Sequence, residues 1–390
     1  MLDTLIRDGL IIDGTGAPWF RGHIGIQGGR IVGIWELNPP SAVHVIEANG
    51  AFIAPGFIDV HTHDDIAFLR NPLRPEKTIQ GVTTIVTGNC SFSNYPASGT
   101  ETVNSVAEHL GTLLGPVAEQ EIFASHADYV RALECQKLGP NMVSLVGHSP
   151  IRIAVMGFEA RPATTNERLA MEALLDRQLA EGAAGLSLGL VYTPGSWADD
   201  AELLGLACVV ARHGRLLAAH LRNYDYDVEE AIEEFIGLLK RSGAKGLVSH
   251  LQVCGRENWG KMHELLDRLE VARKDGVDIA CDMYPYTAGS STILQLLPPS
   301  AQEGGSKATL QRLSDPQSLA NIRRAVVEDL ADDPGWRSKV GQIGWDNIRI
   351  GGVEVESHRH YEGQSFADLA QAEERDAFEV ATQLMVCYCC

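Results

Sequence analysis

The first 56 residues alternate between short apolar runs and glycine-rich turns. Segments such as LIRDGLIID and HIGIQGGRIVGI are separated by Gly-Gly or Asn-Gly pairs. Apolar runs bounded by such pairs are typical of β-hairpins. We therefore expect residues 1–56 to form the N-terminal part of a small antiparallel β-domain.

The pattern changes at Phe57. Strand-like apolar segments recur from here on, namely FIDVHTH, GVTTIVTG, NMVSLVG, GLSLGL, RLLAAH, GLVSH and GVDIACD. Between them lie longer segments, such as NERLAMEALLDRQLAEG, whose apolar residues follow helical spacing and which end in glycine. Repeated strand–helix–strand units predict parallel strands with crossover helices. Residues 57–290 thus predict a (β/α) barrel of seven strand units, and an open doubly wound sheet is the alternative.

The pattern loosens after the last of these units. Residues 291–352 are rich in turn-forming residues and contain one helical stretch, PQSLANIRRAVVEDL. We interpret them as an insertion that caps the mouth of the barrel. Residues 353–390 predict a helix, QSFADLAQAEERDAFEVATQLM, followed by an atypical tail, VCYCC.

Charge and composition exclude some classes of partner. The formal net charge is -19 and the sequence pI is about 5.1, so nucleic acid and anionic membrane surfaces are poor partners. Asp3, Arg7 and Asp8 interrupt the first apolar stretch, which argues against a signal peptide and favours a cytoplasmic location. In such a chain, structural disulfides among the eight cysteines are not expected. The sequence gives no prediction of the oligomeric state.

Two histidines flank a single residue at the end of the first strand-like segment, FIDVHTHDD. Because side chains alternate along a strand, His61 and His63 should point toward the same face. Imidazole nitrogens are common ligands of zinc-like metals. The apolar strand before the pair favours a metal site, and two solvated histidines at a strand end are the alternative.

Three further candidates end later strand-like segments. His220 ends RLLAAH, His250 ends GLVSH, and Cys90 follows GVTTIVTG. Taken alone, Cys90 would be an inert core residue, but a thiolate beside a metal becomes a ligand. The carboxyl ends of barrel strands share one face, so these residues should meet the H-x-H pair there, which favours the barrel. Such a site lowers the pKa of a bound water to about 7, and the residues alone therefore predict metal-assisted hydrolysis.

Together these segments resemble the N-acyl-D-amino-acid deacylase (D-aminoacylase) family of the amidohydrolase superfamily. The resemblance is carried by PGFIDVHTHDD, GVTTIVTGNC, the two later strand-end histidines and DMYPYTAGSS. In that family a cysteine and two histidines hold a tight zinc ion, and Cys90, His220 and His250 match them. His61 and His63 match a pair that contributes to a weaker second metal position.

The resemblance extends from the first residues through about Ser291 and also implies contacts with the substrate. Tyr284 and Ser290 match groups near the substrate carboxylate, and Tyr192 in GLVYTPGS matches another pocket tyrosine. The implied activity is zinc-dependent hydrolysis of the amide bond of small-molecule N-acyl-D-amino acids by a metal-activated water. Another amidohydrolase, acting on a lactone, a cyclic amide or a dipeptide, is the alternative. A serine hydrolase based on GLSLG, with Ser187 as nucleophile, is a more distant one.

The sequence departs from the family after the seventh strand unit. The family places an aspartate at the end of an eighth strand, in a segment resembling I-G-S-D-G, and nothing similar follows here. We interpret VCYCC as a truncated or frameshifted end, so the expected fold is a (β/α)8-type metal-dependent hydrolase barrel lacking strand eight. A metal-binding chain with little activity is then a further alternative. A metal site formed by Cys387, Cys389 and Cys390 is the alternative interpretation of the tail.

Overall fold

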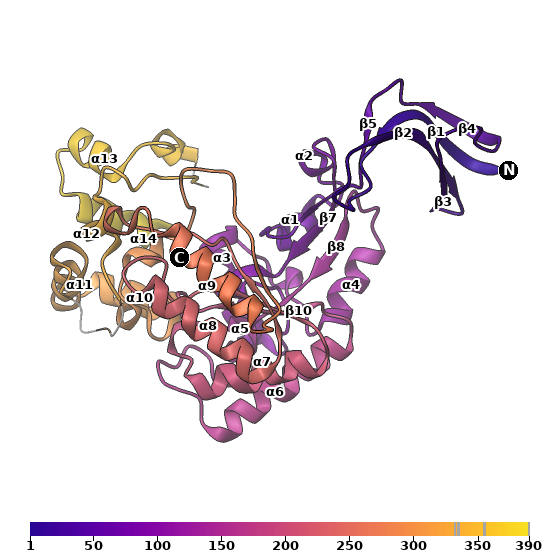
Figure 1. Cartoon of the computed structure of the whole chain (residues 1–390). Coiled ribbons are helices and arrows are strands. Elements are labelled where there is room, and N and C mark those ends of the chain that lie inside the picture. The colour runs from indigo at the N-terminus through magenta and orange to yellow at the C-terminus, as the bar shows by residue number, and fades with distance from the viewer. Residues whose placement is uncertain (331–332, 334–335, 354–355, 389–390) are drawn as a thin grey trace. The chain divides into compact units, whose positions relative to one another are not determined.

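The computed structural model describes residues 1–330, 333, 336–353 and 356–388 (Figure 1). The chain divides into two compact units. The first comprises Met1–Ile58 and Glu76–Thr84, and the second comprises Asp59–Pro75 and Ile85–Cys390. All candidate site residues belong to the second unit. Cys389 and Cys390 of the tail lie outside the described residues.

The first unit contains a five-stranded sheet in the order β3-β2-β1-β4, with β5 also on β1. Its strands are β1 (Leu2–Ile11), β2 (Phe20–Gln27), β3 (Arg30–Trp35), β4 (Ala42–Glu47) and β5 (Phe52–Ile53). β1, β2 and β3 are antiparallel neighbours, whereas β4 and β5 pair with β1 in parallel.

This parallel pairing corrects the expectation of a purely antiparallel domain for residues 1–56. The β2–β3 hairpin turns at Gly28 and Gly29, which both have positive φ angles. After β3 the chain does not turn back directly but crosses to the other edge of β1, where β4 begins at Ala42. A strand reached by such a crossover runs parallel to its new neighbour.

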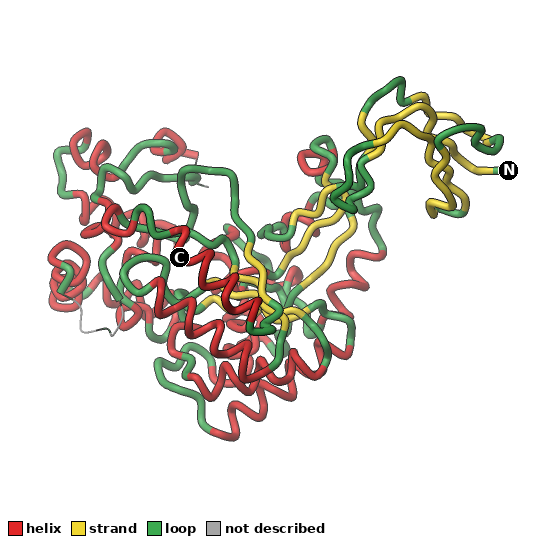
Figure 2. Tube along the Cα trace, in the orientation of Figure 1, coloured by secondary structure: helices red, strands yellow, loops and turns green. Residues whose placement is uncertain are grey.

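The second unit contains a five-stranded parallel sheet in the order β13-β12-β11-β10-β9. Figure 2 colours the strands of the chain yellow. Its strands are β9 (Val146–Gly147), β10 (Gly185–Gly189), β11 (Leu216–His220), β12 (Lys245–Val248) and β13 (Ile279–Cys281). Most of their residues are buried, as expected for parallel strands covered by helices on their faces.

A separate three-stranded sheet has the order β6-β7-β8. Its members are β6 (Phe57–Asp59), β7 (Val82–Thr87) and β8 (Asn141–Ser144). β8 and β9 are separated by Leu145 alone, so they form one strand unit interrupted at that residue. Each strand unit from β6 to β13 therefore corresponds to one of the seven segments named from the sequence.

Helices follow these strands in chain order (Figure 1). They are α1 (Asp65–Arg70), α2 (Pro75–Thr78), α3 (Thr100–Leu114), α4 (His126–Glu134), α5 (His148–Met156), α6 (Thr165–Ala180), α7 (Asp200–Arg212), α8 (Val228–Ser242) and α9 (Met262–Lys274). Side-chain caps fix where several of them begin: Thr164 forms a capping box with Glu167 at α6, and Asp199 caps α7.

The residues after β13 form more helices than the sequence predicted. Besides α11 (Pro316–Glu328), the cap region contains α10 (Gly305–Ser314) and α12 (Lys339–Ile343), and the tail forms α13 (Phe366–Ala372) and α14 (Ala377–Tyr388).

Short 3-10 helices occur along the described chain at η1 (Asn89–Ser91), η2 (Glu119–Glu121), η3 (Gly195–Trp197), η4 (Arg256–Asn258), η5 (Ile293–Leu296), η6 (Pro299–Gln302) and η7 (Glu356–Tyr361).

The cap region and the tail share one hydrophobic cluster. It includes Leu297 and Val326 of the cap and Phe366, Phe378 and Met385 of the tail. The two segments proposed as 291–352 and 353–390 therefore pack together. Among the described residues, no helix has both the length and the apolarity needed to cross a membrane.

Candidate metal site

Three side chains from distant parts of the second unit converge. The Cys90 Sγ lies 3.2 Å from the Nε2 of His61 and 3.3 Å from the Nε2 of His250. One candidate ligand atom from each residue lies within 4.8 Å of those of the other two. The residues follow β6, β7 and β12, so the cluster is built at the carboxyl ends of strands. Sulfur and imidazole nitrogen in this arrangement are suited to zinc.

The backbone takes rare conformations where it delivers two of these ligands. Cys90 has a φ of 52° and His250 a φ of 36°, both in the left-handed region that L-residues seldom adopt. Just before Cys90, Gly88 has a φ of 76°, and a Cβ there would collide with the Leu145 carbonyl. Non-glycine residues in this region often mark functional sites, because the surrounding fold must compensate the strain.

His63 and His220 lie next to this cluster. The His63 ring centroid is 5.5 Å from that of His61, and the His220 centroid is 4.5 Å from that of His250. The resemblance assigned His220 to the tight metal position together with Cys90 and His250. In the structure the two imidazoles beside the Cys90 sulfur are those of His61 and His250, and His220 borders them.

The donor set fits a metal ion. The Nδ1 atoms of His63, His220 and His250 are buried and have no hydrogen-bond partner among the described residues. Buried polar atoms normally have a partner, so the unpaired Nδ1 atoms of His63 and His220 are available to a ligand, whereas His250 faces the Cys90 sulfur through its Nε2. One ion held by sulfur and imidazole nitrogens would satisfy part of this demand.

Burial and mutual charge set the protonation of the imidazoles. Burial lowers the pKa of His63 to about 3 and that of His250 to about 4, so both rings are neutral at pH 7. Burial also opposes a charge on His61, but the negative charges of Cys90 and Asp282 outweigh it and raise its pKa to about 10. Without a metal His61 therefore carries a proton at pH 7 and must release it to become a ligand, whereas the neutral His63 and His250 already offer the lone pairs that a metal needs.

Asp282 is a site residue that the sequence interpretation missed. Its Oδ2 lies 3.3 Å from the His61 Nδ1, and its Oδ1 accepts a hydrogen bond from the His250 backbone N–H. A carboxylate on the far nitrogen of a ligating histidine fixes the orientation of the ring. The signal was present in the sequence, because Asp282 directly follows GVDIAC, as the histidines follow their own strands.

Two of the residues predicted to contact the substrate, Tyr192 and Tyr284, lie beside the candidate ligands, whereas Ser290 does not contact Tyr192 and its neighbour Ser291 does. The Tyr192 ring is 4.8 Å from that of His220, and the Tyr284 ring is 6.2 Å from that of His250. Tyr284 donates its hydroxyl proton to the Gln252 Oε1. Ser290 is exposed, and its neighbour Ser291 is the serine that contacts Tyr192, with 3.5 Å between the hydroxyl oxygens.

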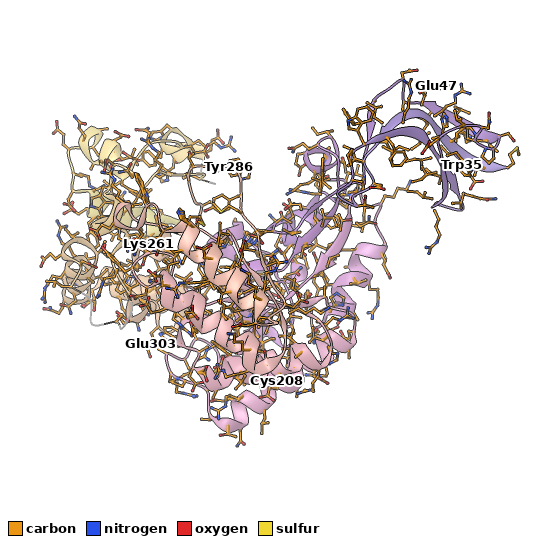
Figure 3. The ribbon with its side chains drawn as sticks, in the orientation of Figure 1. Trp35, Glu47, Cys208, Lys261, Tyr286 and Glu303 are labelled. Atoms are coloured by element: carbon orange, nitrogen blue, oxygen red, sulfur yellow. The ribbon has the colours of Figure 1, made fainter. Side chains whose placement is uncertain are left out.

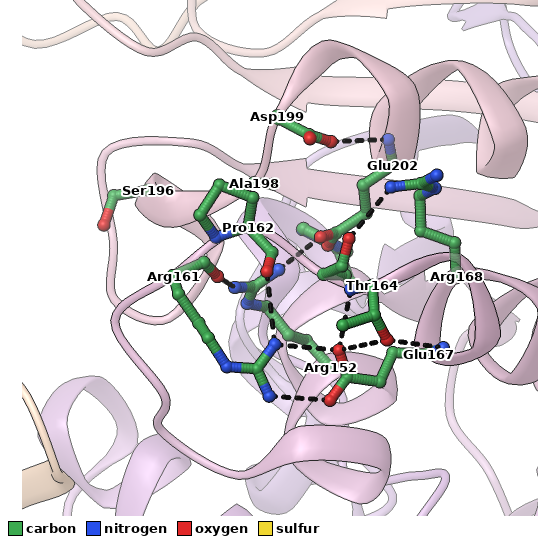
Figure 4. Close-up of polar contacts among 12 residues, drawn as sticks. Arg152, Arg161, Pro162, Thr164, Glu167, Arg168, Ser196, Ala198, Asp199 and Glu202 are labelled. Carbon is green, nitrogen blue, oxygen red and sulfur yellow. Dashed lines mark hydrogen bonds and ion pairs between the residues drawn. The ribbon is translucent and has the colours of Figure 1, made fainter.

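Ser187 of the GLSLG segment and the buried His148 both make hydrogen bonds or ion pairs inside the fold. The Ser187 hydroxyl donates to the Gly88 carbonyl and accepts from the Ser91 N–H at 3.0 Å, so it is not poised as a nucleophile. His148 is fully buried, and its Nε2 lies 2.7 Å from the Oε1 of Glu202. Glu202 also accepts a hydrogen bond from the buried Arg152 (Figure 4).

A thiol and imidazoles gathered at the carboxyl ends of strands in an α/β fold place this chain in the class of metal-site hydrolase folds of the amidohydrolase type. No family model matches the chain. Among curated proteins, it is 41% identical over 293 residues to an N-acyl-D-glutamate deacylase of Alcaligenes xylosoxydans xylosoxydans. The matched region covers 75% of this chain and 58% of the relative.

Solved structures agree. The chain matches a zinc- and phosphonate-bound N-acyl-D-glutamate deacylase of Bordetella bronchiseptica with a TM-score of 0.77 and 36% identity, over 97% of this chain and 69% of that one. It also matches a D-aminoacylase studied for its binuclear metal centre, with a TM-score of 0.77 and 29% identity, over 98% and 70% of the two chains. The chain belongs to the N-acyl-D-amino-acid deacylase family, which confirms the resemblance. It spans somewhat less than two thirds of the length of its curated relative.

Proposed function

We propose that this protein hydrolyses the amide bond of N-acyl-D-amino acids with the help of zinc. The observation that carries the proposal is the Cys90 sulfur lying within 3.3 Å of two imidazole nitrogens at strand ends. The named activities of its relatives supply the substrate class.

Five residues would hold the metal. Cys90, His61 and His250 offer the closest set of donor atoms, and His220 and His63 border it with unpaired ring nitrogens. We propose one tight zinc position that includes Cys90, and a second, weaker position. When bound, zinc lowers the pKa of water and polarises a carbonyl oxygen.

The surrounding residues would position the substrate. Tyr192 is buried beside His220, so its hydroxyl can donate to the carbonyl oxygen of a bound amide. Burial raises the pKa of Tyr192, which keeps this hydroxyl protonated at neutral pH. Tyr284, whose ring lies 6.2 Å from that of His250, is the proposed partner of the substrate carboxylate, and Ser290 is proposed as a second partner.

Removal and return of zinc tests the proposal. The full chain is stripped with a chelator, and hydrolysis of N-acetyl-D- and N-acetyl-L-amino acids is measured before and after zinc is restored. We expect hydrolysis of the D-substrates only, lost with the metal and regained with it. Turnover that survives the chelator, or hydrolysis of the L-substrates at an equal rate, would contradict the proposal.

A matched pair of variants separates Cys90 from a general effect of thiol loss. Cys90→Ser should lose tight zinc and turnover together, because a hydroxyl does not replace a thiolate ligand. Cys135→Ser removes an exposed thiol and should retain both properties. Zinc content measured by elemental analysis reports the metal independently of activity.

A further inference from the structure

A small cavity lies beside the proposed site, between α3, the loop after β10 and the first segments of the cap region. Tyr192 lines it, and so does Phe92, two residues after Cys90. The Phe92 ring is 5.0 Å from that of Tyr192 and 6.1 Å from that of His63. The cavity therefore adjoins neighbours of two candidate ligands, His220 and His63.

The volume and walls of the cavity suit a short group. It holds about 40 Å³, and a single water needs about 10–15 Å³ on this measure, so only a few heavy atoms fit. Much of its wall is apolar, with Phe92, Phe158, Val191 and Leu294 among the lining residues. A methyl, ethyl or similarly short segment would be removed from water there.

The charge along the wall discriminates against an anion. Within the described residues that line the cavity there is no lysine or arginine, and Glu108 supplies a carboxylate. This carboxylate accepts a hydrogen bond from the Ser306 N–H but has no cation to balance it in the lining. Burial lowers the pKa of His109 in the same wall to about 4, so its imidazole is neutral at pH 7. A second carboxylate would meet like charge in a partly desolvated space.

Two buried polar atoms in the wall lack a partner. The Gln295 Nε2 and the His109 Nε2 have no hydrogen bond among the described residues. The amide nitrogen of Gln295 can only donate. A neutral acceptor, such as a carbonyl, amide or hydroxyl oxygen, would satisfy it without bringing a charge near Glu108.

We propose that this cavity receives a short, uncharged substituent of the N-acyl amino acid, and that Glu108 excludes a substituent that carries a carboxylate. The inference rests on the proposed function and adds a selectivity to it. The substituent is either the acyl group or the amino-acid side chain, since both have the required chemistry. The relatives named for N-acyl-D-glutamate act on an anionic side chain, so this selectivity would set the chain apart if the side chain occupies the cavity.

Binding of ligand pairs that differ in one carboxylate tests the inference. N-acetyl-D-glutamine is compared with N-acetyl-D-glutamate for the side chain, and N-butyryl-D-alanine with N-succinyl-D-alanine for the acyl group. Dissociation constants are measured by calorimetry on the metal-free full chain, which does not turn the ligands over. In one of the two pairs, we expect the neutral ligand to bind at least about tenfold more tightly than the charged ligand. The pair that shows this difference identifies whether the side chain or the acyl group occupies the cavity.

Variants of two glutamates on α3, Glu108 and Glu101, test whether Glu108 causes the selectivity against a carboxylate. Glu108→Gln keeps the shape of the side chain. It should bring the ratio of the two dissociation constants in the selective pair, charged ligand over neutral ligand, close to one. Glu101→Gln removes the same formal charge from an exposed position and should leave the ratio unchanged. Equal or tighter binding of the carboxylate ligand in both pairs, no measurable binding by any ligand, or an unchanged ratio in Glu108→Gln would overturn the proposal. Because these readouts need no turnover, they are separate from a failure of zinc-dependent hydrolysis.

Discussion

Asp282 accepts a hydrogen bond from the His250 backbone and faces the Nδ1 of His61, so one carboxylate contacts two candidate ligands. We predict that Asp282→Asn weakens zinc binding about 10–100-fold, the usual loss when the carboxylate partner of a ligating histidine is replaced. Competition with a chromogenic chelator measures the affinity. Asp278→Asn, an exposed change just before the same strand, is the control and should bind zinc as the wild type does.

Arg222 holds the loop that carries Tyr192. It donates hydrogen bonds to the carbonyls of Ser196 and Ala198, at 2.9 and 3.3 Å, and also pairs with Glu234. Lysine keeps the charge but lacks the forked donors. We therefore predict that Arg222→Lys lowers kcat/KM by about tenfold through the position of Tyr192.

A double-mutant cycle tests this coupling. If Arg222 acts through Tyr192, adding Arg222→Lys to Tyr192→Phe should cause little further loss of kcat/KM. Fully additive losses would instead show that the two residues act independently. Arg212→Lys, at an exposed position of α7, serves as the control.

Tyr284 is expected to bind the substrate and not to take part in the chemical step. Tyr284→Phe removes only the hydroxyl, and we predict that it raises KM for N-acyl-D-amino acids more than it lowers kcat. Steady-state kinetics gives both constants. Tyr286, whose side chain is exposed on the loop after β13, provides the matched control Tyr286→Phe (Figure 3). An unchanged KM in Tyr284→Phe would remove that residue from the substrate site.

The Arg152–Glu202–His148 network is predicted to stabilise the fold. The side chains of all three are fully buried, and Glu202 receives the Arg152 guanidinium as well as facing His148. Removing the charge of one partner leaves the other uncompensated, so Glu202→Gln should lower the free energy of unfolding by about 3–5 kcal/mol. Urea unfolding measures the change. Glu230→Gln, at an exposed position of α8, should change the free energy of unfolding by only about a few tenths of a kcal/mol.

His109 is predicted to contribute to acid sensitivity. Burial lowers its pKa to about 4 in the folded chain, against about 6.5 when unfolded. The unfolded state therefore binds the proton first, so stability is retained above pH 6.5 and falls as the pH drops toward 4, by roughly 3 kcal/mol in total. His109→Gln should lose less stability over this range than the wild type, as measured by urea unfolding at each pH. His263→Gln, at an exposed position, should follow the wild type.

The sequence predicted the gathering of the metal-site residues because topology alone brings them together. His61, Cys90 and His250 each follow a strand-like segment. Although β12 lies in a different sheet from β6 and β7, the carboxyl ends of barrel strands share one face. Membership of the deacylase family was predictable for the same reason, because its motifs are these strand ends.

Details that depend on loops were not predictable. Whether Ser290 or Ser291 turns toward Tyr192 depends on the path of a loop that has no regular period. The parallel pairing of β4 depends on a crossover that leaves no turn motif. Such features arise from tertiary packing, which hydrophobic periodicity does not record.

The three closest candidate ligands lie far apart along the chain: Cys90 is 29 positions from His61 and 160 positions from His250. An ion bound by all of them would act as a reversible cross-link that closes very long loops, and unfolding would have to release it. Free zinc at about a thousandfold above the dissociation constant would add about 4 kcal/mol to stability. The cellular lifetime of this protein should therefore follow the zinc supply, and cells starved of zinc should degrade it faster than cells supplied with zinc.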